Sequence, residues 1–353
     1  MPCRADNAAK RSETHRIVWL RERVVTDPRV LCLGEVLFDR IADQPGLSVE
    51  EVVSWTPYPG GAPANVACAL VKLGTPAAFL GCVGEDEPGQ ILVELLRSTG
   101  VNGVGIQRHA LSPTREVYVV RSDEGDRQFA GFGDRDTTVF ADTRLQADLL
   151  PGELFESAEF LVLGTLELAY PMTRQAIDRA LNFADDRYLK VVMDVNWRPM
   201  FWPDPDDAKP IIRQYIERAD FLKLSDEEAL WLFNTKEPAA IAHSLGHIEG
   251  VLVTAGEQGC SYYLSNHEGK IPAFEVEVED TTGAGDSFLA GFIHQLCQQG
   301  MAVLDDGDAV RDLVVYATAV GALTTIRAGA IAAQPTAAEV AAFLYLHNQQ
   351  SAS

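Results

Sequence analysis

The sequence lacks several features that define large classes of protein. None of its apolar runs approaches the roughly 20 residues that a helix needs to span a bilayer, so we expect no membrane segment. Its six cysteines never fall in a C-x-x-C spacing, which argues against a zinc site or a disulfide framework and favours reduced thiols in a cytoplasmic protein. No G-x-x-x-x-G-K-[ST] string occurs, so a P-loop nucleotide site is excluded.

Basic residues are also scarce. The chain has 29 Lys and Arg against 51 Asp and Glu, a net charge of -22, which opposes binding to nucleic acid or anionic lipid and favours small-molecule partners. Seven of the basic residues lie in residues 1–29, together with four acids and without the apolar segment of a signal peptide. We expect residues 1–29 to form a disordered basic extension and residues 346–353 to form a short tail.

Between these ends the chain alternates strand and helix patterns. "RVLCLGEVLF" reads as the opening strand, and later apolar runs such as "AAFLGCVG" and "KVVMDVN" are typical of strands buried on both faces. Helical stretches that end in glycine separate them. The pattern predicts an α/β fold, a doubly wound and mainly parallel sheet flanked by helices, in one domain over residues 30–345.

Two segments, at about 37–58 and about 112–134, break the alternation. The second alternates apolar and polar residues around an Asp-Glu-Gly-Asp turn, which indicates a strand pair. We therefore expect a small β-sheet lid on the main domain. The apolar face of such a sheet needs a cover, either a ligand cleft or the same sheet of a second subunit, so we expect a homodimer through the lid sheets.

The stretch "VEDTTGAGDSFLAGF" (278–292) predicts a glycine-rich turn followed by a helix from about Gly285 to Gln299. The small residues Gly283, Ala284 and Gly285 let a ligand approach the backbone, and the first N–H groups of a helix attract anions. Asp286 is either an ordinary acid of the first helical turn or a base beside a bound phosphate.

The string "DTTGAGD" resembles the second signature of the PfkB, or ribokinase-like, sugar kinases, and "GGAPANVACALVKLG" (60–74) resembles the first. A third stretch, "GEVLFD" (34–39), resembles the strand on which this family carries a substrate-binding aspartate. The resemblance spans roughly residues 30–340. It implies transfer of the ATP γ-phosphoryl group to a sugar hydroxyl, with Asp286 as the base and the N–H groups of residues 283–285 as the anion hole.

On the substrate side the resemblance implies that Asp39 and Asn65 hold sugar hydroxyls and that Gly60 and Gly61 admit the sugar. Asn65 has a second interpretation as a residue that only starts a helix. "DVNWRPMFW" (194–202) resembles fructokinases and 2-keto-3-deoxygluconate kinases. Within it, Arg198 has three interpretations: it meets a substrate carboxylate, it approaches phosphate, or it pairs structurally with Asp194.

On the nucleotide side, three further stretches resemble the family. "KLSDEE" (223–228) has Ser225 where the family has Asn, and its glutamate implies Mg²⁺ held through water, while Ser225 also fits a helix cap. "VTAGEQG" (253–259) resembles a nucleotide loop or forms only a tight turn, and "YATAVGALTTIRAGA" (316–330) resembles the segment beside the adenine. The implied residues are Lys223, Ser225, Thr254, Gly256, Gly259 and Thr318 for ATP, Glu228 for Mg²⁺, and Asp280 and Thr282 for K⁺.

These features predict an ATP-dependent sugar kinase acting on a primary hydroxyl, with D-fructose converted to fructose 6-phosphate as the first expectation. A 2-keto-3-deoxygluconate kinase, which needs a cation for its carboxylate, is the alternative within the class. A noncatalytic fructokinase-like binding protein is the alternative outside it. The intact Asp286 and glycine turn argue against the noncatalytic protein.

Overall fold

The computed structural model describes residues 27–122 and 127–351. Most of the expected basic extension (1–29) and the Asp-Glu-Gly-Asp turn of the lid therefore lie outside the described residues. No helix in the two described ranges is long and apolar enough to cross a bilayer.

The described residues form a central sheet of nine strands in the order β13-β12-β11-β10-β9-β8-β1-β4-β5. All neighbours from β11 to β5 are parallel, whereas β12 and β13 run antiparallel to their neighbours. The predicted doubly wound, mainly parallel sheet is confirmed, with a two-stranded antiparallel edge that the pattern did not predict. The bounds are β1 Val30–Leu33, β4 Ala77–Gly84, β5 Ile106–His109, β8 Phe160–Leu163, β9 Lys190–Asp194, β10 Phe221–Ser225, β11 Gly250–Thr254, β12 Cys260–Leu264 and β13 His267–Ile271.

The expected single opening strand is wrong, because "RVLCLGEVLF" is divided between two sheets. β1 ends at Leu33, and the chain leaves the central sheet at Gly34, where φ is +154°. A Cβ atom on Gly34 would lie 2.4 Å from Pro63 Cγ, so only glycine fits at this crossing. Asp39 consequently lies in β2 (Leu37–Ala42), outside the central sheet.

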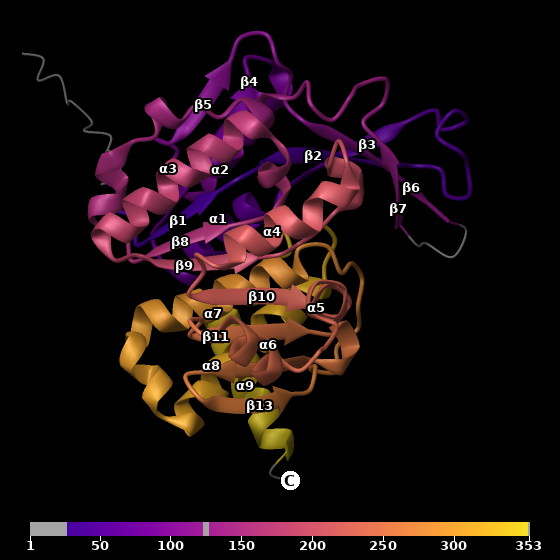
Figure 1. The fold of residues 1–353 in the computed structure, drawn as a ribbon. Coiled ribbons are helices and arrows are strands. Elements are labelled where there is room, and N and C mark those ends of the chain that lie inside the picture. The colour runs from indigo at the N-terminus through magenta and orange to yellow at the C-terminus, as the bar shows by residue number, and fades with distance from the viewer. Residues whose placement is uncertain (1–26, 123–126, 352–353) are drawn as a thin grey trace, which may run out of the picture.

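β2 belongs to a four-stranded sheet in the order β3-β2-β6-β7, made of the described residues of both segments that break the alternation. β3 spans Trp55–Gly60, β6 spans Glu116–Arg121 and β7 spans Arg127–Gly131. Figure 1 shows this sheet extending sideways from the helices that cover the central sheet. The predicted lid sheet is confirmed as a separate sheet.

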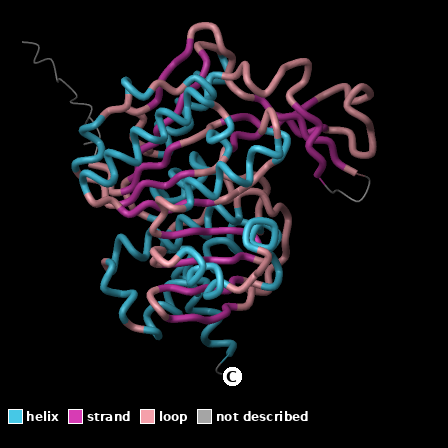
Figure 2. Tube along the Cα trace, in the orientation of Figure 1, coloured by secondary structure: helices cyan, strands magenta, loops and turns pink. Residues whose placement is uncertain are grey.

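Helices cover both faces of the central sheet, and the strands lie between the two helical layers (Figure 2). One apolar core contains buried residues of α1, α2, α7, α8 and α9, and the other contains those of α3, α4, α5 and α6. The last helix continues across the boundary expected at residue 345. The bounds are α1 Ala62–Leu73, α2 Glu87–Thr99, α3 Pro171–Arg187, α4 Ala208–Ile216, α5 Asp226–Phe233, α6 Pro238–Leu245, α7 Ala284–Gln299, α8 Gly307–Thr325 and α9 Ala337–Ser351.

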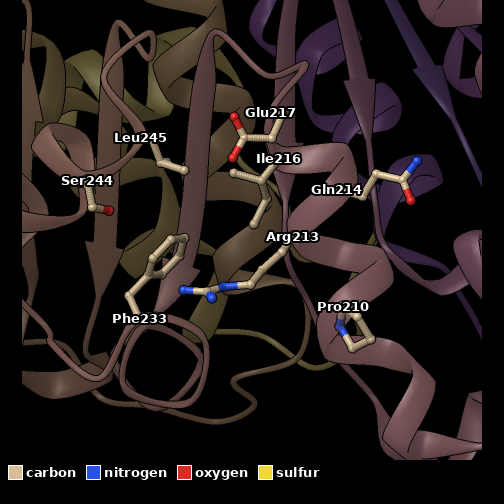
Figure 3. A pocket seen from close by; sticks show the side chains of 8 residues that line it. All are labelled: Pro210, Arg213, Gln214, Ile216, Glu217, Phe233, Ser244 and Leu245. Carbon is tan, nitrogen blue, oxygen red and sulfur yellow. The ribbon is translucent and has the colours of Figure 1, made fainter.

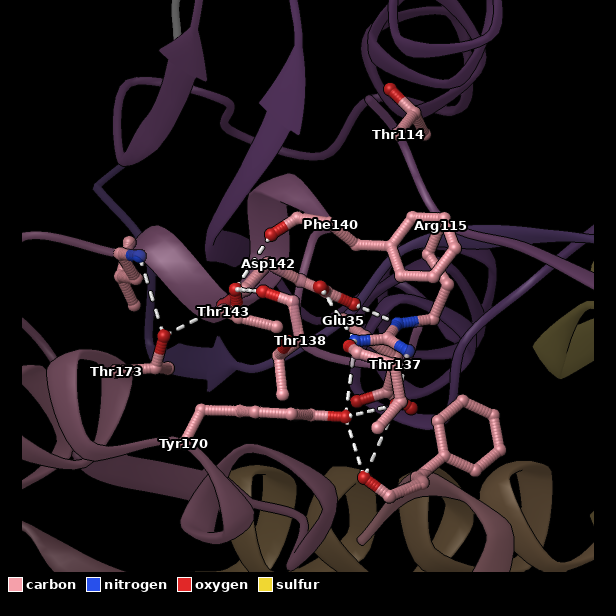
Figure 4. A network of polar contacts seen from close by, with 12 residues as sticks. Glu35, Thr114, Arg115, Thr137, Thr138, Phe140, Asp142, Thr143, Tyr170 and Thr173 are labelled. Atoms are coloured by element: carbon pink, nitrogen blue, oxygen red, sulfur yellow. Dashed lines mark hydrogen bonds and ion pairs between the residues drawn. The ribbon is translucent and has the colours of Figure 1, made fainter. Parts of the chain in front are cut away.

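A buried ion pair attaches the lid to the central domain (Figure 4). Arg115, which directly precedes β6, is 1% exposed and donates from Nε and Nη2 to the two carboxylate oxygens of Asp142 at 2.5 and 2.9 Å. Its guanidinium also bonds Thr137 and Tyr170 and lies over four aromatic rings. The backbone carbonyl of Arg115 accepts from Phe38 N–H in β2, so the residue that directly precedes β6 is also hydrogen-bonded to β2.

Replacing Arg115 with Ala is expected to reduce the free energy of unfolding by about 3–5 kcal/mol, because Asp142 is left as a buried, unpaired charge. Replacing Arg97, whose pair with Glu94 is exposed on α2, is expected to cost at most about 1 kcal/mol. Urea denaturation followed by circular dichroism measures both. Equal losses in the two variants would contradict the role given to the buried pair.

Candidate active site

The site is built around the N-terminus of α7. Gly283 caps the helix in the left-handed conformation (φ 77°) without a side-chain hydrogen bond, and its missing Cβ leaves room for Ala330, 2.9 Å from where that atom would lie. Ala284 N–H donates to the carbonyl of Thr281 at 3.2 Å. Among the described residues, the N–H groups of Gly283, Gly285 and Asp286 have no acceptor, so these three groups are available to an anion.

Asp286 lies in the first turn of α7 and contacts a residue that is 221 positions away in the sequence. Asn65 Nδ2 donates to Asp286 Oδ2 at 2.8 Å. The pKa of Asp286 is raised to about 6. Burial and the charge of Asp194 raise it, and the hydrogen bond from Asn65 and the charges of Lys223 and Arg198 partly oppose this rise. The carboxyl group therefore titrates near neutrality, as a general base requires.

The second interpretation of Asn65, as a residue that only starts a helix, is wrong. The N-cap of α1 is Gly61, and Asn65 lies within the helix, where its side chain caps nothing. Asn65 Oδ1 is buried and has no partner among the described residues. Because a buried amide oxygen favours a hydrogen bond, this atom is available to a hydroxyl group.

A buried ion pair lies beneath the anion site. Lys223 in β10 donates to both oxygens of Asp194 at 2.9 and 2.8 Å. A Cβ on Gly285 would lie 3.2 Å from Lys223 Nζ, so the ammonium group sits directly beside the glycine turn. Burial lowers the pKa of Lys223, but the charges of Asp194, Glu228 and Asp286 and the hydrogen bond to Asp194 together outweigh burial and raise it, so the lysine stays protonated. The strongly acidic chain thus provides a positive charge where an anion would bind.

Ser225 and Glu228 form the N-terminal cap of α5. Ser225 Oγ accepts from Glu228 N–H at 3.1 Å, and Glu228 Oε2 accepts from Ser225 N–H at 2.8 Å, so the cap interpretation is confirmed. Glu228 Oε1 accepts from Trp197 N–H at 2.7 Å. Burial raises the pKa of Glu228. Since each oxygen already accepts one backbone N–H, the carboxylate suits a hydrated cation better than direct coordination.

A cavity of about 760 Å³ opens beside the N-terminus of α7. This volume lies in the range of small-molecule sites. The turn after β11 lines one side of it and α8 the other, so the "VTAGEQG" stretch is both a strand connection and a cavity wall. Four of the six residues predicted for ATP, and two of the glycine turn, are in the lining: Thr254, Gly256, Gly259, Thr318, Ala284 and Gly285. Lys223 and Ser225 are not in the lining.

Asp280 ties together two loops next to this cavity. Its Oδ1 accepts from Thr282 N–H and Thr282 Oγ1 at 3.0 and 2.7 Å, and its Oδ2 accepts from Gly329 N–H at 3.0 Å. The N–H groups of Glu279 and Asp280 donate to the carbonyl of Thr325. The loop predicted to hold K⁺ is therefore fixed against the end of α8.

The two glycines predicted to admit a sugar have packing reasons as well. A Cβ on Gly60 would lie 2.9 Å from Asp39 Oδ2, and one on Gly61 would lie 2.5 Å from the carbonyl oxygen of Glu35. Tyr58, opposite Asp39 in the lid sheet, reaches the loop at Gly329, where an added Cβ would lie 3.7 Å from its ring. The lid sheet thus lies next to the loop that contains Gly329, which Asp280 holds beside the cavity.

Arg198 does not pair with Asp194, so that interpretation is wrong: Asp194 is held by Lys223. Arg198 is exposed and donates from Nη1 to the carbonyl of Trp197 at 3.0 Å. Its charge nevertheless acts on Asp286, whose pKa it lowers. An exposed cation near the base remains available to an anionic group of a ligand.

A second cavity, of about 450 Å³, contains none of the predicted site residues (Figure 3). It lies between α4 and the segment around α6, and Arg213 lies over the Phe233 ring at 5.5 Å within it. No cluster of three or more metal-ligating side chains occurs in the described parts of the chain. The chemistry is therefore concentrated at α7.

Known proteins resemble this chain in sequence and in fold. The model of the pfkB family carbohydrate kinases matches residues 27–337. The chain is 35% identical over 315 residues to probable fructokinase-5 of Arabidopsis thaliana, covering 88% of this chain and 96% of that protein. The chain belongs to the pfkB family of carbohydrate kinases, ATP-dependent sugar kinases.

Two solved structures share the fold. A fructokinase from Xylella fastidiosa with bound ATP has a TM-score of 0.81 and 28% identity, covering 91% of this chain and 98% of the other. A fructokinase from Vibrio cholerae O395 in a form with fructose, ADP and calcium has a TM-score of 0.77 and 28% identity, covering 90% and 99%. The ribokinase-like architecture expected from the motifs is therefore confirmed.

We expect log kcat/KM to fall as the pH decreases through about 6, the pKa of Asp286, because the protonated carboxyl group cannot accept a proton. Replacing Asn65 with Ala removes a hydrogen bond that lowers this pKa, so the acid limb should move to higher pH. Asn182→Ala on the surface of α3 is the matched control. An unmoved limb in the Asn65 variant would contradict the contact's effect on the base.

Proposed function

We propose that the protein transfers the γ-phosphoryl group of ATP to the primary hydroxyl of D-fructose, giving fructose 6-phosphate. The observation that carries this proposal is the hydrogen bond from Asn65 to Asp286. It joins a residue expected to hold the sugar to the expected base, at the helix end that opens into the 760 Å³ cavity.

Asp286 is the general base in this proposal. Oδ2 is held by Asn65, so Oδ1 takes the proton from the attacking hydroxyl as the new O–P bond forms. The bond between the γ-phosphorus and the β,γ-bridging oxygen of ATP breaks, and ADP leaves with that oxygen. The pKa near 6 leaves most of the carboxylate ionised at neutral pH while keeping it basic enough to accept a proton. The unpartnered Oδ1 of Asn65 accepts a second sugar hydroxyl, which fixes the acceptor relative to the base.

The phosphoryl group is stabilised by three features of the α7 N-terminus. The N–H groups of Gly283, Gly285 and Asp286 have no acceptor in the described chain and point the positive end of the helix at the site. Lys223, beside Gly285 and paired with Asp194, adds an ammonium group that can donate to a phosphate oxygen. Thr254, Gly256, Gly259 and Thr318 line the cavity that would take the rest of the nucleotide.

Two cations fit residues of the site. Glu228, buried with each oxygen accepting a backbone N–H, would hold hydrated Mg²⁺ through water, and the metal would neutralise phosphate charge. The loop of Asp280 and Thr282, fixed to Gly329 and Thr325, would hold K⁺. Both assignments rest on donor chemistry and family resemblance.

Fructose is favoured by the relatives, since the curated and solved proteins named above are fructokinases and one solved structure contains fructose. Asp39, placed by Gly60 in the lid, would bind further hydroxyls.

We also propose that residues 30–345 form the kinase domain and that two copies pair through their lid sheets. The lid exposes apolar side chains that such a contact would cover: Phe129 is 50% exposed, and Val53, beside β3, is 85% exposed.

Arg198 supports a second candidate, a 2-keto-3-deoxygluconate kinase. Its guanidinium is exposed, acts on Asp286 and makes its hydrogen bond to a backbone carbonyl, so it could receive a substrate carboxylate. A noncatalytic sugar- or nucleotide-binding protein is the third candidate. The shifted pKa of Asp286 and the intact anion site favour a catalyst over a binding protein.

Replacing Asp286 with Asn is expected to preserve the fold and ATP binding but to lower kcat at least about 100-fold, because the base is lost. Asp308→Asn is the matched control, since Asp308 is an exposed acid in the first turn of α8. A coupled assay of ADP release measures both. Turnover of the Asp286 variant within a few-fold of the wild type would contradict the proposed mechanism.

Replacing Arg198 with Ala distinguishes the two candidate substrates. If D-fructose is the substrate, its KM should change less than about threefold, because no carboxylate contact is lost. If 2-keto-3-deoxygluconate is the substrate, its kcat/KM should fall at least about tenfold with the loss of a charge-assisted contact. Arg213→Ala in the second cavity is the control, and the same assay serves both substrates.

A further inference from the structure

Two buried glutamates lie together at the carboxyl ends of adjacent strands. Glu35 follows β1, and Glu167 lies in the short 3₁₀ helix Leu166–Ala169 that follows β8, the parallel neighbour of β1. Each residue is 2% exposed. The mechanism above uses neither of them, and an unpaired buried carboxylate is costly, so their presence needs an explanation.

Three of their four oxygens have no conventional partner among the described residues. Glu35 Oε1 accepts from Ala62 N–H at 2.8 Å, whereas Glu35 Oε2 and both oxygens of Glu167 accept nothing. Figure 4 shows Arg115 and Asp142 together with Glu35, and the guanidinium of Arg115 is already engaged by Asp142. Glu167 Oε2 lies 3.2 Å from where a Cβ atom of Gly34, the neighbour of Glu35 in the chain, would be, and each carboxyl group shifts the pKa of the other. Two ionised carboxylates cannot form a hydrogen bond with each other, whereas one shared proton provides it.

The electrostatic surroundings keep a proton on the pair. Burial raises the pKa of Glu35 to about 7, against the backbone hydrogen bonds that lower it, and Asp142 adds to the rise. Burial, the charge of Glu35 and the charge of Asp142 raise the pKa of Glu167 well above its usual value. The other polar groups facing this region are Arg115, held by Asp142, and Tyr170, held by Arg115 and Thr137. Of the two carboxyl groups, Glu35, which accepts from Ala62 N–H, favours the charged form, and Glu167 holds the proton more tightly.

We propose that Glu167 and Glu35 are positioning residues that share one proton, and that this pair holds the N-terminus of α1, and through it Asn65 and the base Asp286, in the arrangement needed for sugar binding. The contact is direct, because Ala62 is the first residue of α1. Asn65 follows in the same turn, its N–H donating to the carbonyl of Gly61 at 2.8 Å, and its side chain reaches Asp286.

The packing transmits any movement of the pair to α1. A Cβ on Gly34 would lie 2.4 Å from Pro63 Cγ and 3.2 Å from Glu167 Oε2, and one on Gly61 would lie 2.5 Å from the Glu35 carbonyl. The two glutamates are therefore closely packed against the first turn of α1. When the shared proton is lost, two negative charges repel at this point, and we expect α1 to be displaced and sugar binding to weaken.

The first test measures stability and does not depend on catalysis. Unfolded glutamate has a pKa near 4.5, so the folded wild type binds a proton that the unfolded chain releases above that pH, and its stability falls as the pH rises through the pKa of the pair. Glu167→Gln replaces the protonated acid by a neutral isostere and removes the contribution of Glu167 to this slope. Glu94→Gln, exposed on α2, is the control for charge.

In urea titrations from about pH 5 to about pH 9, the difference in unfolding free energy between Glu167→Gln and the wild type should grow in favour of the variant, approaching a tenfold change in the unfolding constant per pH unit. Glu35→Gln, which can accept from Ala62 N–H and donate to Glu167, should behave in the same way and serves if the first variant does not fold. Curves parallel to the wild type in these variants would overturn the shared proton.

The second test is kinetic and rests on the proposed function. The KM for D-fructose should rise several-fold with pH in the wild type and in Glu94→Gln, and it should stay flat in Glu167→Gln, while the acid limb of kcat set by Asp286 remains. If the difference in unfolding free energy between Glu167→Gln and the wild type does not change with pH while the wild type phosphorylates fructose normally, the shared proton is refuted and the proposed function is not. Lack of turnover by the wild type with every sugar, together with the expected stability slopes, would refute the proposed function and leave the shared proton standing. An identical rise of KM in Glu167→Gln and the wild type would refute the link from the pair to sugar binding.

Discussion

The site depends on the hydrogen bond between Asn65 and Asp286, because it joins two helices whose contacting residues are 221 positions apart in the sequence. Asn65 belongs to α1, which follows the lid strand β3, and Asp286 belongs to α7, which starts beside the nucleotide-sized cavity. Both helices pack in the same apolar core on one face of the central sheet. The residues expected to hold the sugar and the residue expected to activate it are therefore held by one rigid layer.

The charges of the site follow from this arrangement. An acidic protein that binds a polyanion must concentrate positive charge locally, and here the α7 N-terminus and Lys223 do so. Asp194 holds Lys223 in place and at the same time raises the pKa of Asp286. One buried carboxylate thus acts on both the proposed anion site and the proposed base.

Local sequence patterns predicted the parts of the fold and site that depend on neighbours in the chain. The turn at Gly283, the helix that follows it and the cap made by Ser225 and Glu228 are features of this kind. The division of the opening strand at Gly34 was missed, because only the contact with Pro63 in α1 reveals it. The pairing of Lys223 with Asp194, the buried Arg115 and the Glu35–Glu167 pair were missed for the same reason: each depends on which strands become neighbours. Charged residues inside otherwise apolar segments were the available signal, and they do not identify their partners.

The central claim is that this arrangement phosphorylates a ketose with ATP, and a survey of acceptors tests it most directly. ADP release by the purified protein with Mg²⁺ and K⁺ should be measured with fructose, glucose, ribose, 2-keto-3-deoxygluconate, adenosine and fructose 6-phosphate. The account predicts the highest kcat/KM for fructose. ATP binding without ADP release for any acceptor would contradict it.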